Sequence, residues 1–306
     1  MKKFGIATLA LGLVLSASAY AADISASGTV VQSLQTGGKT ADTAAYGFGK
    51  SRITLNLKAD DKVSVTYIAK VESNLDADYI FADIKTDLGL LRVGTIYECH
   101  ANYGGGIYQT NTLLGLTVSK GTGIGFYTKY DKYNIGIFNI TAPLAQNATK
   151  VYGAKVDTSY GDLTVGAVAK TAVNDDNNGA SIEVEGSYKI GAGKVSAQYY
   201  MDLNDNGAVL MPSLATVVNN VQLATKKRSY LGIFGEYNVG YGVGVYGDYV
   251  MALNDDTKTA WQDNQLKAGA SYALNAKSTL YAELQSNTEK DADAVYTSSL
   301  GLQVKF

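Results

Sequence analysis

The chain has 306 residues, and its 26 basic and 28 acidic side chains give a formal net charge of −2 at pH 7. This composition lacks the basic footprint that nucleic acid requires, so it excludes that class of partner. The 33 glycines, 23 tyrosines and 2 prolines are typical of strands joined by tight turns, and no apolar run is long enough for a transmembrane helix.

The first element in chain order is an expected export signal. Lys2 and Lys3 form a basic start, residues 4–18 are a short apolar stretch, and residues 19–21 read Ala-Tyr-Ala, a cleavage pattern of small residues. These features predict a secretory signal peptide over residues 1–21. Residues 22–306 then form one exported barrel domain, whose net charge is near −4 because two lysines are removed.

From residue 23 onward, apolar and polar residues alternate in short segments, which is the pattern of half-exposed strands. Bacterial outer-membrane barrels usually have an even number of strands. The number expected here is sixteen, and it would be fourteen or eighteen if the segments below merge or split one hairpin. We expect sixteen strands, at approximately 23–34, 46–58, 62–72, 78–86, 90–97, 123–131, 134–141, 149–159, 162–171, 180–190, 193–203, 227–238, 242–253, 264–273, 277–287 and 294–306.

The connections between these strands alternate between short and long. Outer-membrane barrels have short periplasmic turns and longer extracellular loops. If both termini are periplasmic, the short connections of this chain fall on the periplasmic side and the long ones on the extracellular side. The short connections fall at residues 59–61, 87–89, 132–133, 160–161, 191–192, 239–241 and 274–276, and the long ones include 35–45, 98–122, 204–226 and 254–263.

The second strand shows how the two faces differ. One face carries Ser51, Ile53, Leu55 and Leu57, and the other carries Lys50, Arg52, Thr54, Asn56 and Lys58. A soluble sandwich and a barrel both give this period of two. The export signal and the last strand favour the barrel, in which the apolar face meets lipid and the polar face lines water.

The last strand ends on an aromatic residue. Leu300, Leu302, Val304 and Phe306 alternate with small or polar residues, which suits a strand that pairs with the first one and places its aromatic ring in an interfacial girdle. The many tyrosines suit the same girdle, with the ring in lipid and the hydroxyl among headgroups. Tyrosine is also simply a favourable strand residue.

Two stretches resemble the general trimeric porins of Gram-negative bacteria. Residues 51–58 read Ser-Arg-Ile-Thr-Leu-Asn-Leu-Lys and precede an acidic turn, and residues 81–94 read Phe-Ala-Asp-Ile-Lys-Thr-Asp-Leu-Gly-Leu-Leu-Arg-Val-Gly. The resemblance is best over residues 46–98 and at the C-terminus. It implies an all-β fold, a transmembrane antiparallel barrel of sixteen strands with a long third loop folded into the lumen, and assembly as a homotrimer. Barrels of 16–18 strands in this family leave an aqueous channel.

The resemblance also implies a pore constriction, where the third loop meets the inner wall. The loop is expected over residues 98–122, with Glu98 as its acid, and a loop of that length is usually functional. The matching wall residues are Lys50, Arg52, Glu72 and Arg92.

Three features depart from the family pattern. Thr95 stands where the family has an arginine. The loop carries only Glu98 as an acid, with His100 and Lys120 as its other ionisable side chains apart from Cys99 and tyrosines, so we expect a weaker field across the pore. The connection at 73–77 is short, whereas the corresponding loop of the family contacts a neighbouring subunit.

Catalytic and metal-binding alternatives find little support in the sequence. The only histidine, His100, follows the only cysteine, Cys99, and no third ligand or orienting carboxylate is indicated beside them. The acid pairs at 175–176 and 255–256 could bind calcium weakly, but such pairs are more often solvated loop tips. We therefore expect no enzyme activity, no cofactor, no metal and no internal disulfide.

The sequence predicts an outer-membrane porin that forms a water-filled channel for passive diffusion of ions and small hydrophilic solutes. Its partners are then membrane lipid and those solutes. Two alternatives stay open. One is a solute-specific channel, which needs a ladder of aromatic residues and arginines, and the other is a structural barrel whose loops bind a partner.

Overall fold

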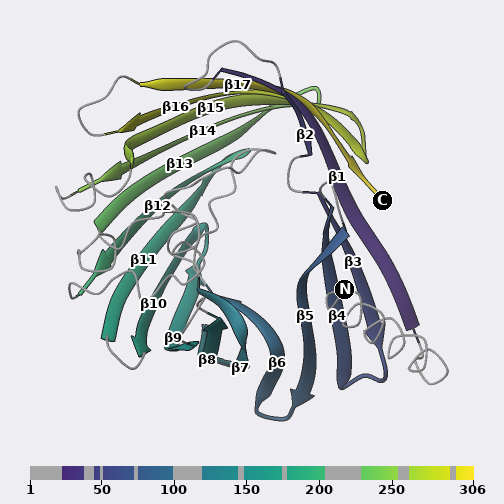
Figure 1. Cartoon of the computed structure of the whole chain (residues 1–306), viewed down its shortest axis with the longest axis vertical. Helices are drawn as coiled ribbons and strands as arrows, with labels where there is room; N and C mark the ends of the chain where they lie inside the picture. Colours follow the sequence, from purple (N-terminus) through teal and green to yellow (C-terminus); the bar gives the residue numbers. More distant parts are fainter. Residues whose placement is uncertain are drawn as a thin grey trace.

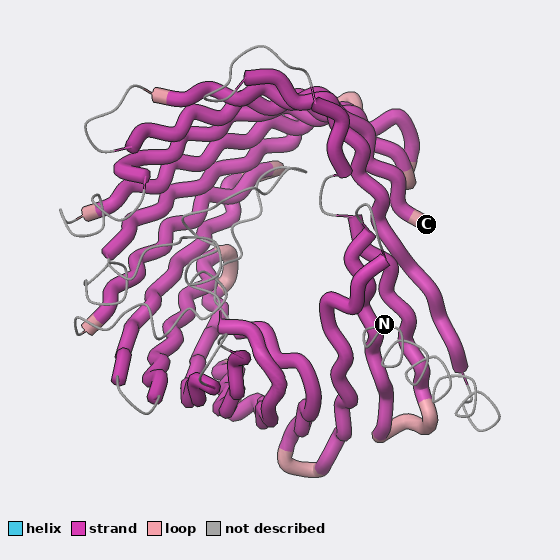
Figure 2. The backbone as a smooth tube through the Cα atoms, viewed as in Figure 1, coloured by secondary structure: helices cyan, strands magenta, loops and turns pink. Residues whose placement is uncertain are grey.

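A computed structural model describes residues 23–37, 45–48, 51–71, 75–98, 119–143, 148–173, 178–203, 229–253, 262–289 and 294–306. Every regular element within these residues is a β-strand (Figure 2). The described residues contain no helix that is long and apolar enough to cross a membrane. The predicted signal peptide, residues 1–21, lies outside the described part.

The strand segments follow one another along the chain, and all pairings between them are antiparallel. Apolar and polar residues alternate in most of them, which suits a sheet with one face in lipid and the other in water. Their bounds are β1 Asp23–Gly37, β2 Ala45–Phe48, β3 Ser51–Lys58, β4 Val63–Val71, β5 Leu75–Thr86, β6 Gly89–Glu98, β7 Ser119–Tyr130, β8 Tyr133–Pro143, β9 Ala148–Tyr160, β10 Leu163–Val173, β11 Asn178–Ile190, β12 Gly193–Asp202, β13 Ser229–Gly240, β14 Val243–Ala252, β15 Gln262–Asn275, β16 Ser278–Glu289 and β17 Val295–Lys305.

The sheet closes on itself because the first strand pairs with the last. β1 pairs with β17 from Thr29 opposite Lys305 to Gly37 opposite Thr297, and Figure 1 shows the purple β1 beside the yellow β17. On its other edge β1 pairs with both β2 and β3. These two segments are therefore successive parts of one strand, and the prediction of a closed barrel of sixteen strands is confirmed.

Phe306 extends the seam by one pair beyond β17. Its N–H donates to the carbonyl oxygen of Gly28 at 3.1 Å, and its own carbonyl accepts from the Gly28 N–H at 3.1 Å. The terminal aromatic residue thus pairs with the first strand, as its position in the sequence predicts.

The predicted strands match the observed ones closely, and most differences lie at the ends that lead into long connections. The strand predicted at 123–131 is β7, which begins at Ser119, and Ser119 pairs with Glu98 at the end of β6. The interpretation of residues 98 and 119–122 as loop is therefore wrong. The rest of the predicted third loop, 99–118, and its predicted place in the lumen lie outside the described residues.

The short connections all lie at one edge of the barrel, because successive strands run in opposite directions. Two of the tight turns begin at Gly161 and Gly191, with φ of 60° and 57°. Glycine adopts this backbone region without strain, and two-residue hairpin turns require it at their first position. The turn predicted at 160–161 is therefore one residue early.

The acidic turn after β3 is held by its own side chains. Asp60 Oδ1 accepts hydrogen bonds from the N–H groups of Lys62 and Val63, each at 2.7 Å. Lys58 Nζ donates to Asp61 Oδ1 at 2.7 Å, and this hydrogen bond holds the pKa of the Asp61 carboxyl below its usual range. The acids of this turn therefore have a structural role.

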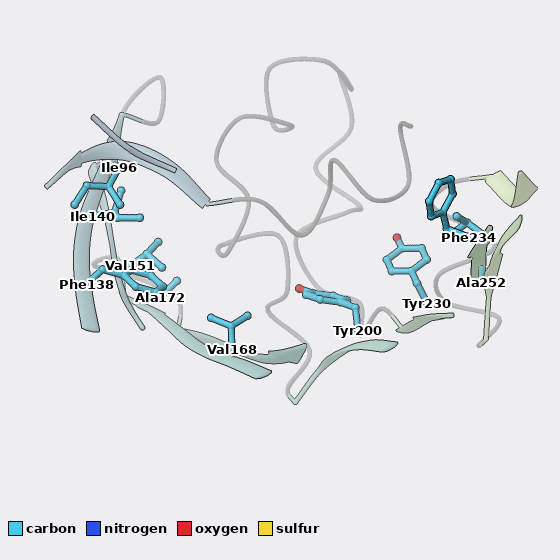
Figure 3. Close-up of a cluster of buried hydrophobic side chains, with 11 residues drawn as sticks. Ile96, Phe138, Ile140, Val151, Val168, Ala172, Tyr200, Tyr230, Phe234 and Ala252 are labelled. Carbon is cyan, nitrogen blue, oxygen red and sulfur yellow. The ribbon is translucent and has the colours of Figure 1, made fainter. Parts of the chain in front are cut away.

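Figure 3 identifies the inner face of the wall, because its labelled side chains project toward the inside of the barrel. Successive side chains of a strand point to opposite faces, and residues that are paired across two strands point to the same face. The labelled positions therefore show which of the other strand residues face inward and which face outward. The inner face is not uniformly polar. It carries a cluster of buried hydrophobic side chains between β6 and β14: Ile96, Phe138, Ile140, Val151, Val168, Ala172, Tyr200, Tyr230, Phe234, Val250 and Ala252.

The outer face is apolar and open to the surroundings, as contact with lipid hydrocarbon requires. Its exposed aliphatic side chains include Val156, Val165, Val184, Ile233, Val245, Leu266, Leu284 and Leu300. Exposed tyrosines lie on this face near the short turns: Tyr130, Tyr133, Tyr160, Tyr188, Tyr237 and Tyr272. These tyrosines lie where the predicted interfacial girdle places them.

Heat is expected to change the mobility of the folded protein in a denaturing gel. A closed barrel satisfies its ladder hydrogen bonds internally and has no open edge, so it resists detergent until it is heated. Samples refolded in detergent and loaded with and without boiling would check this. Identical mobility of the two samples would contradict the closed seam between β1 and β17.

Candidate functional site

Of the five residues predicted to form the constriction, the structure describes two with their side chains. Arg52 lies on β3 and Arg92 on β6. Glu98 is the last residue of β6, and only its main-chain position is described. Lys50 and Glu72 lie outside the described residues.

Arg92 is held by an acid that faces it across a hairpin. Its Nε and Nη2 donate to Asp83 Oδ1 and Oδ2 at 2.7 and 2.8 Å, and the two residues are directly opposite each other on β5 and β6. Their side chains are 29% and 18% exposed. This bidentate pair fixes the orientation of the guanidinium group and offsets its charge.

Aromatic rings extend the Arg92 site along the wall. The Arg92 guanidinium carbon lies 4.1 Å from the ring centroid of Phe81 and 5.7 Å from that of Tyr127, and Lys155 Nζ lies 4.9 Å from the same Tyr127 ring. Gly136 makes room for this arrangement, since a Cβ there would lie 2.9 Å from Tyr127 Cδ1 and 3.0 Å from Lys155 Cε. Cations and rings in this geometry attract each other.

Arg52 belongs to a different part of the same wall. It lies opposite Thr29 on β1 and opposite Lys70 on β4, and its guanidinium carbon lies 5.4 Å from the ring centroid of Tyr79. Two cations directly opposite each other add their potentials at the wall. Arg52 and Lys70 therefore place two basic groups side by side on the inner face, and the residue opposite Lys70 on β5 is Asp76.

The structure does not bring Arg52 and Arg92 together. Arg92 is opposite Asp83, Asp83 is opposite Ser64, and Ser64 is opposite Lys58. Arg92 and Lys58 are therefore the two ends of one row of cross-strand partners, which runs perpendicular to the strands. At about 3.4 Å per residue, Arg52 lies about 20 Å farther along β3.

Charged residues of this wall that were not predicted as part of the site include Lys70, Asp83, Lys155 and Lys170. Asp83 could have been found, because a two-residue turn at 87–88 pairs residues that are symmetric about it, which places Asp83 opposite Arg92. Lys155 and Lys170 lie on the inner faces of β9 and β10, beyond the stretch that carries the family resemblance. Together with Arg52 and Arg92, they make the β3–β10 sector rich in basic groups.

The β11–β16 sector of the inner wall is rich in buried acids. All of these acids are less than a tenth exposed: Glu183, Glu185, Asp202, Asp248 and Glu283. Lys267, which is 1% exposed, is the one buried base among the described residues of this sector. The inner wall is thus divided into a basic and an acidic sector.

The acids of this sector are held by neighbouring side chains. Tyr246 donates its hydroxyl to Glu283 Oε2 at 2.8 Å, and Tyr200 donates its hydroxyl to Asp202 Oδ1 at 2.5 Å. The side-chain amide of Gln198 donates to Glu183 Oε1. These hydrogen bonds orient the carboxylates along the wall.

This inner surface suits passage better than chemistry. Among the described residues, no group of three or more His, Cys, Asp or Glu side chains could hold a metal ion. Fixed charges of both signs line the inside of a closed barrel whose outside is apolar. Such a molecule is a membrane channel for ions and polar solutes.

The chain belongs to the Gram-negative porin family, whose model matches residues 7–292. The match confirms the resemblance found in the sequence and extends it over nearly the whole chain. It gives the protein its place in the outer membrane and its activity as a channel for small solutes. Membership of this family indicates a channel rather than an enzyme.

Solved outer-membrane proteins share the fold at low sequence identity. The channel DcaP of Acinetobacter baumannii gives a TM-score of 0.71 at 12% identity, over 93% of this chain and 97% of that one. The anion-selective porin from Comamonas acidovorans gives 0.67 at 13% identity, over 93% and 99%. OmpT of Vibrio cholerae gives 0.66 at 15% identity, over 92% and 97%. No curated protein sequence matched the chain.

Proposed function

We propose that this porin passes ions and small hydrophilic solutes by passive diffusion, with no chemical step, cofactor or resident metal. The observation that carries the proposal is the division of the inner wall into a basic β3–β10 sector and an acidic β11–β16 sector. Fixed charges along a water-filled path bias which ions enter. Neutral solutes are then sorted by size alone.

The predicted constriction is part of this proposal. It comprises Lys50, Arg52, Glu72, Arg92 and Glu98. Arg92 is paired with Asp83 in a bidentate contact, so much of its charge is offset. We expect Arg52, which lies opposite Lys70, to act on passing ions together with that lysine.

The proposal also covers processing and assembly. We expect residues 1–21 to be removed as a signal peptide, and residues 22–306 to assemble as a homotrimer, without nucleic acid. OmpT of Vibrio cholerae, which shares the fold, has been solved in a trimer form. A mature chain that begins at Ala22 and a particle of three chains in mild detergent would support both expectations, whereas a monomeric particle would contradict the second.

Single-channel recording in a planar lipid bilayer tests the function. We expect stepwise conductance that rises in proportion to bulk salt concentration, and liposome swelling rates that fall steadily with sugar size. Boiled protein is the control. A folded barrel without conductance would favour the structural alternative, and a current that saturates with one solute would favour the solute-specific channel.

A further inference from the structure

Three buried oxygen atoms on the inner face of β12, β14 and β15 have no hydrogen-bond donor among the described residues. Within the part of the chain that the structure describes, Gln198 Oε1, Asp248 Oδ1 and Gln265 Oε1 each lack a hydrogen-bond partner, and their residues are 2%, 7% and 0% exposed. A buried acceptor without a donor costs about 1–3 kcal/mol. Three such atoms in one sector indicate that this wall has hydrogen-bonding capacity left for another molecule.

The remaining capacity at these positions is for accepting only. Gln265 Nε2 already donates to Asn287 Oδ1 at 2.9 Å, and Gln198 Nε2 donates to Glu183. Asp248 Oδ2 lies 3.7 Å from Lys267 Nζ, which is an ion pair but not a close hydrogen bond. A ligand that binds at these three positions must therefore bring N–H or O–H donors.

The charge of the buried side chains in this sector indicates which class of ligand is favoured. Acids outnumber bases among the buried side chains of the described β11–β16 sector, so a cation is favoured over an anion or a neutral alcohol. The described residues contain no cluster that could hold a metal ion. The chemistry that fits both acceptors and charge is an organic cation with N–H donors.

We infer that Asp248 and Gln265 form a binding position for solutes that carry an ammonium or guanidinium group. Asp248 is opposite Lys267 on β15, and Gln265 is two residues from Lys267 on the same face. Diagonal neighbours of this kind are about 7–8 Å apart at their Cα atoms, a gap that one small cationic group can span. The inference rests on the proposed channel function. It implies that the acids that favour cations lie on the barrel wall.

Block of the single-channel current by agmatine, which carries both a guanidinium and an ammonium group, tests the inference. We expect the half-blocking concentration to rise about tenfold in Asp248→Asn, as for one hydrogen bond to a charged group. Gln265→Leu should weaken the block with no shift of the reversal potential, because it removes an acceptor and no charge. Heat-dependent gel mobility verifies that each variant is folded.

Glu236→Gln is the matched control, since it removes one inner-face acid that is 46% exposed and lies 3.7 Å from Lys194. We expect less than a twofold change of the block in this variant. Equal effects of all three substitutions, or no effect of Asp248→Asn and Gln265→Leu, would overturn the inference. A wild-type protein without conductance would instead overturn the proposed function, so the two failures are distinguishable.

Discussion

Replacing Gly123 by alanine is expected to prevent most of the protein from reaching the heat-resistant barrel. Gly123 lies on the inner face of β7, opposite Gly94 and Ile140. A Cβ there would collide with the carbonyl oxygen of Asn139 and lie 2.8 Å from its carbonyl carbon and 2.9 Å from Ile140 Cα. These are main-chain atoms of β8, so two paired strands must separate to make room. Overpacking costs about 1–3 kcal/mol even where neighbours can adjust.

The yield of the unboiled, compact gel band and the midpoint of urea unfolding measure this effect. Gly186→Ala is the control, because a Cβ at Gly186 on β11 meets no heavy atom within 4 Å. Its free energy of unfolding should change by less than about 0.5 kcal/mol. If Gly123→Ala folds with the yield and midpoint of the control, the close approach of β7 and β8 is not as the structure has it.

Replacing Arg52 by glutamate should shift the reversal potential under a salt gradient toward cation selectivity. The substitution changes the wall charge by two units at a position beside Lys70 and over the Tyr79 ring. For an ion at about 8 Å, two charges in water are worth about 1 kcal/mol, which raises the permeability of a cation about fivefold and lowers that of an anion by about the same factor. A lower effective dielectric would enlarge the effect.

Lys277→Glu makes the same change of charge in the exposed turn before β16. Bulk salt screens a charge at that place, so we expect a smaller shift of the reversal potential than in Arg52→Glu. Equal shifts in the two variants would show that net charge, and not the position of Arg52 on the inner wall, sets the selectivity.

The strands were predictable from the sequence because each one carries its own signal. Alternation in a segment such as 180–190 identifies a strand without reference to the rest of the molecule, and antiparallel neighbours connected by short turns then order the sheet. The hairpin register is local too, which is why the pairing of Asp83 with Arg92 follows from a two-residue turn. Strand ends were less predictable, because β7 begins at Ser119, where the alternation is weak.

The arrangement of the inner wall was not predictable in the same way. Whether Arg52 and Arg92 lie near each other depends on the register summed over β3 to β6, which no single hairpin reveals. The resemblance to known porins is carried by residues 46–98, and it predicts the acid of the constriction on the third loop. The buried acids Glu183, Asp248 and Glu283 are far from that stretch in the sequence, and alternation alone does not distinguish a buried inner position from a wet one.

The seam between β1 and β17 has a consequence for how the molecule is made. All other neighbouring strands of the barrel follow one another along the chain. Thr29 and Lys305, which pair across the seam, are separated by nearly the whole chain. Closing so long a loop costs about 3 kcal/mol more than closing a ten-residue one. The seam should therefore form late, and until then β1 and β17 present open edges to which strands of other chains can add. Until the seam closes, these two strand edges are the places on the sheet that need protection from pairing with other chains.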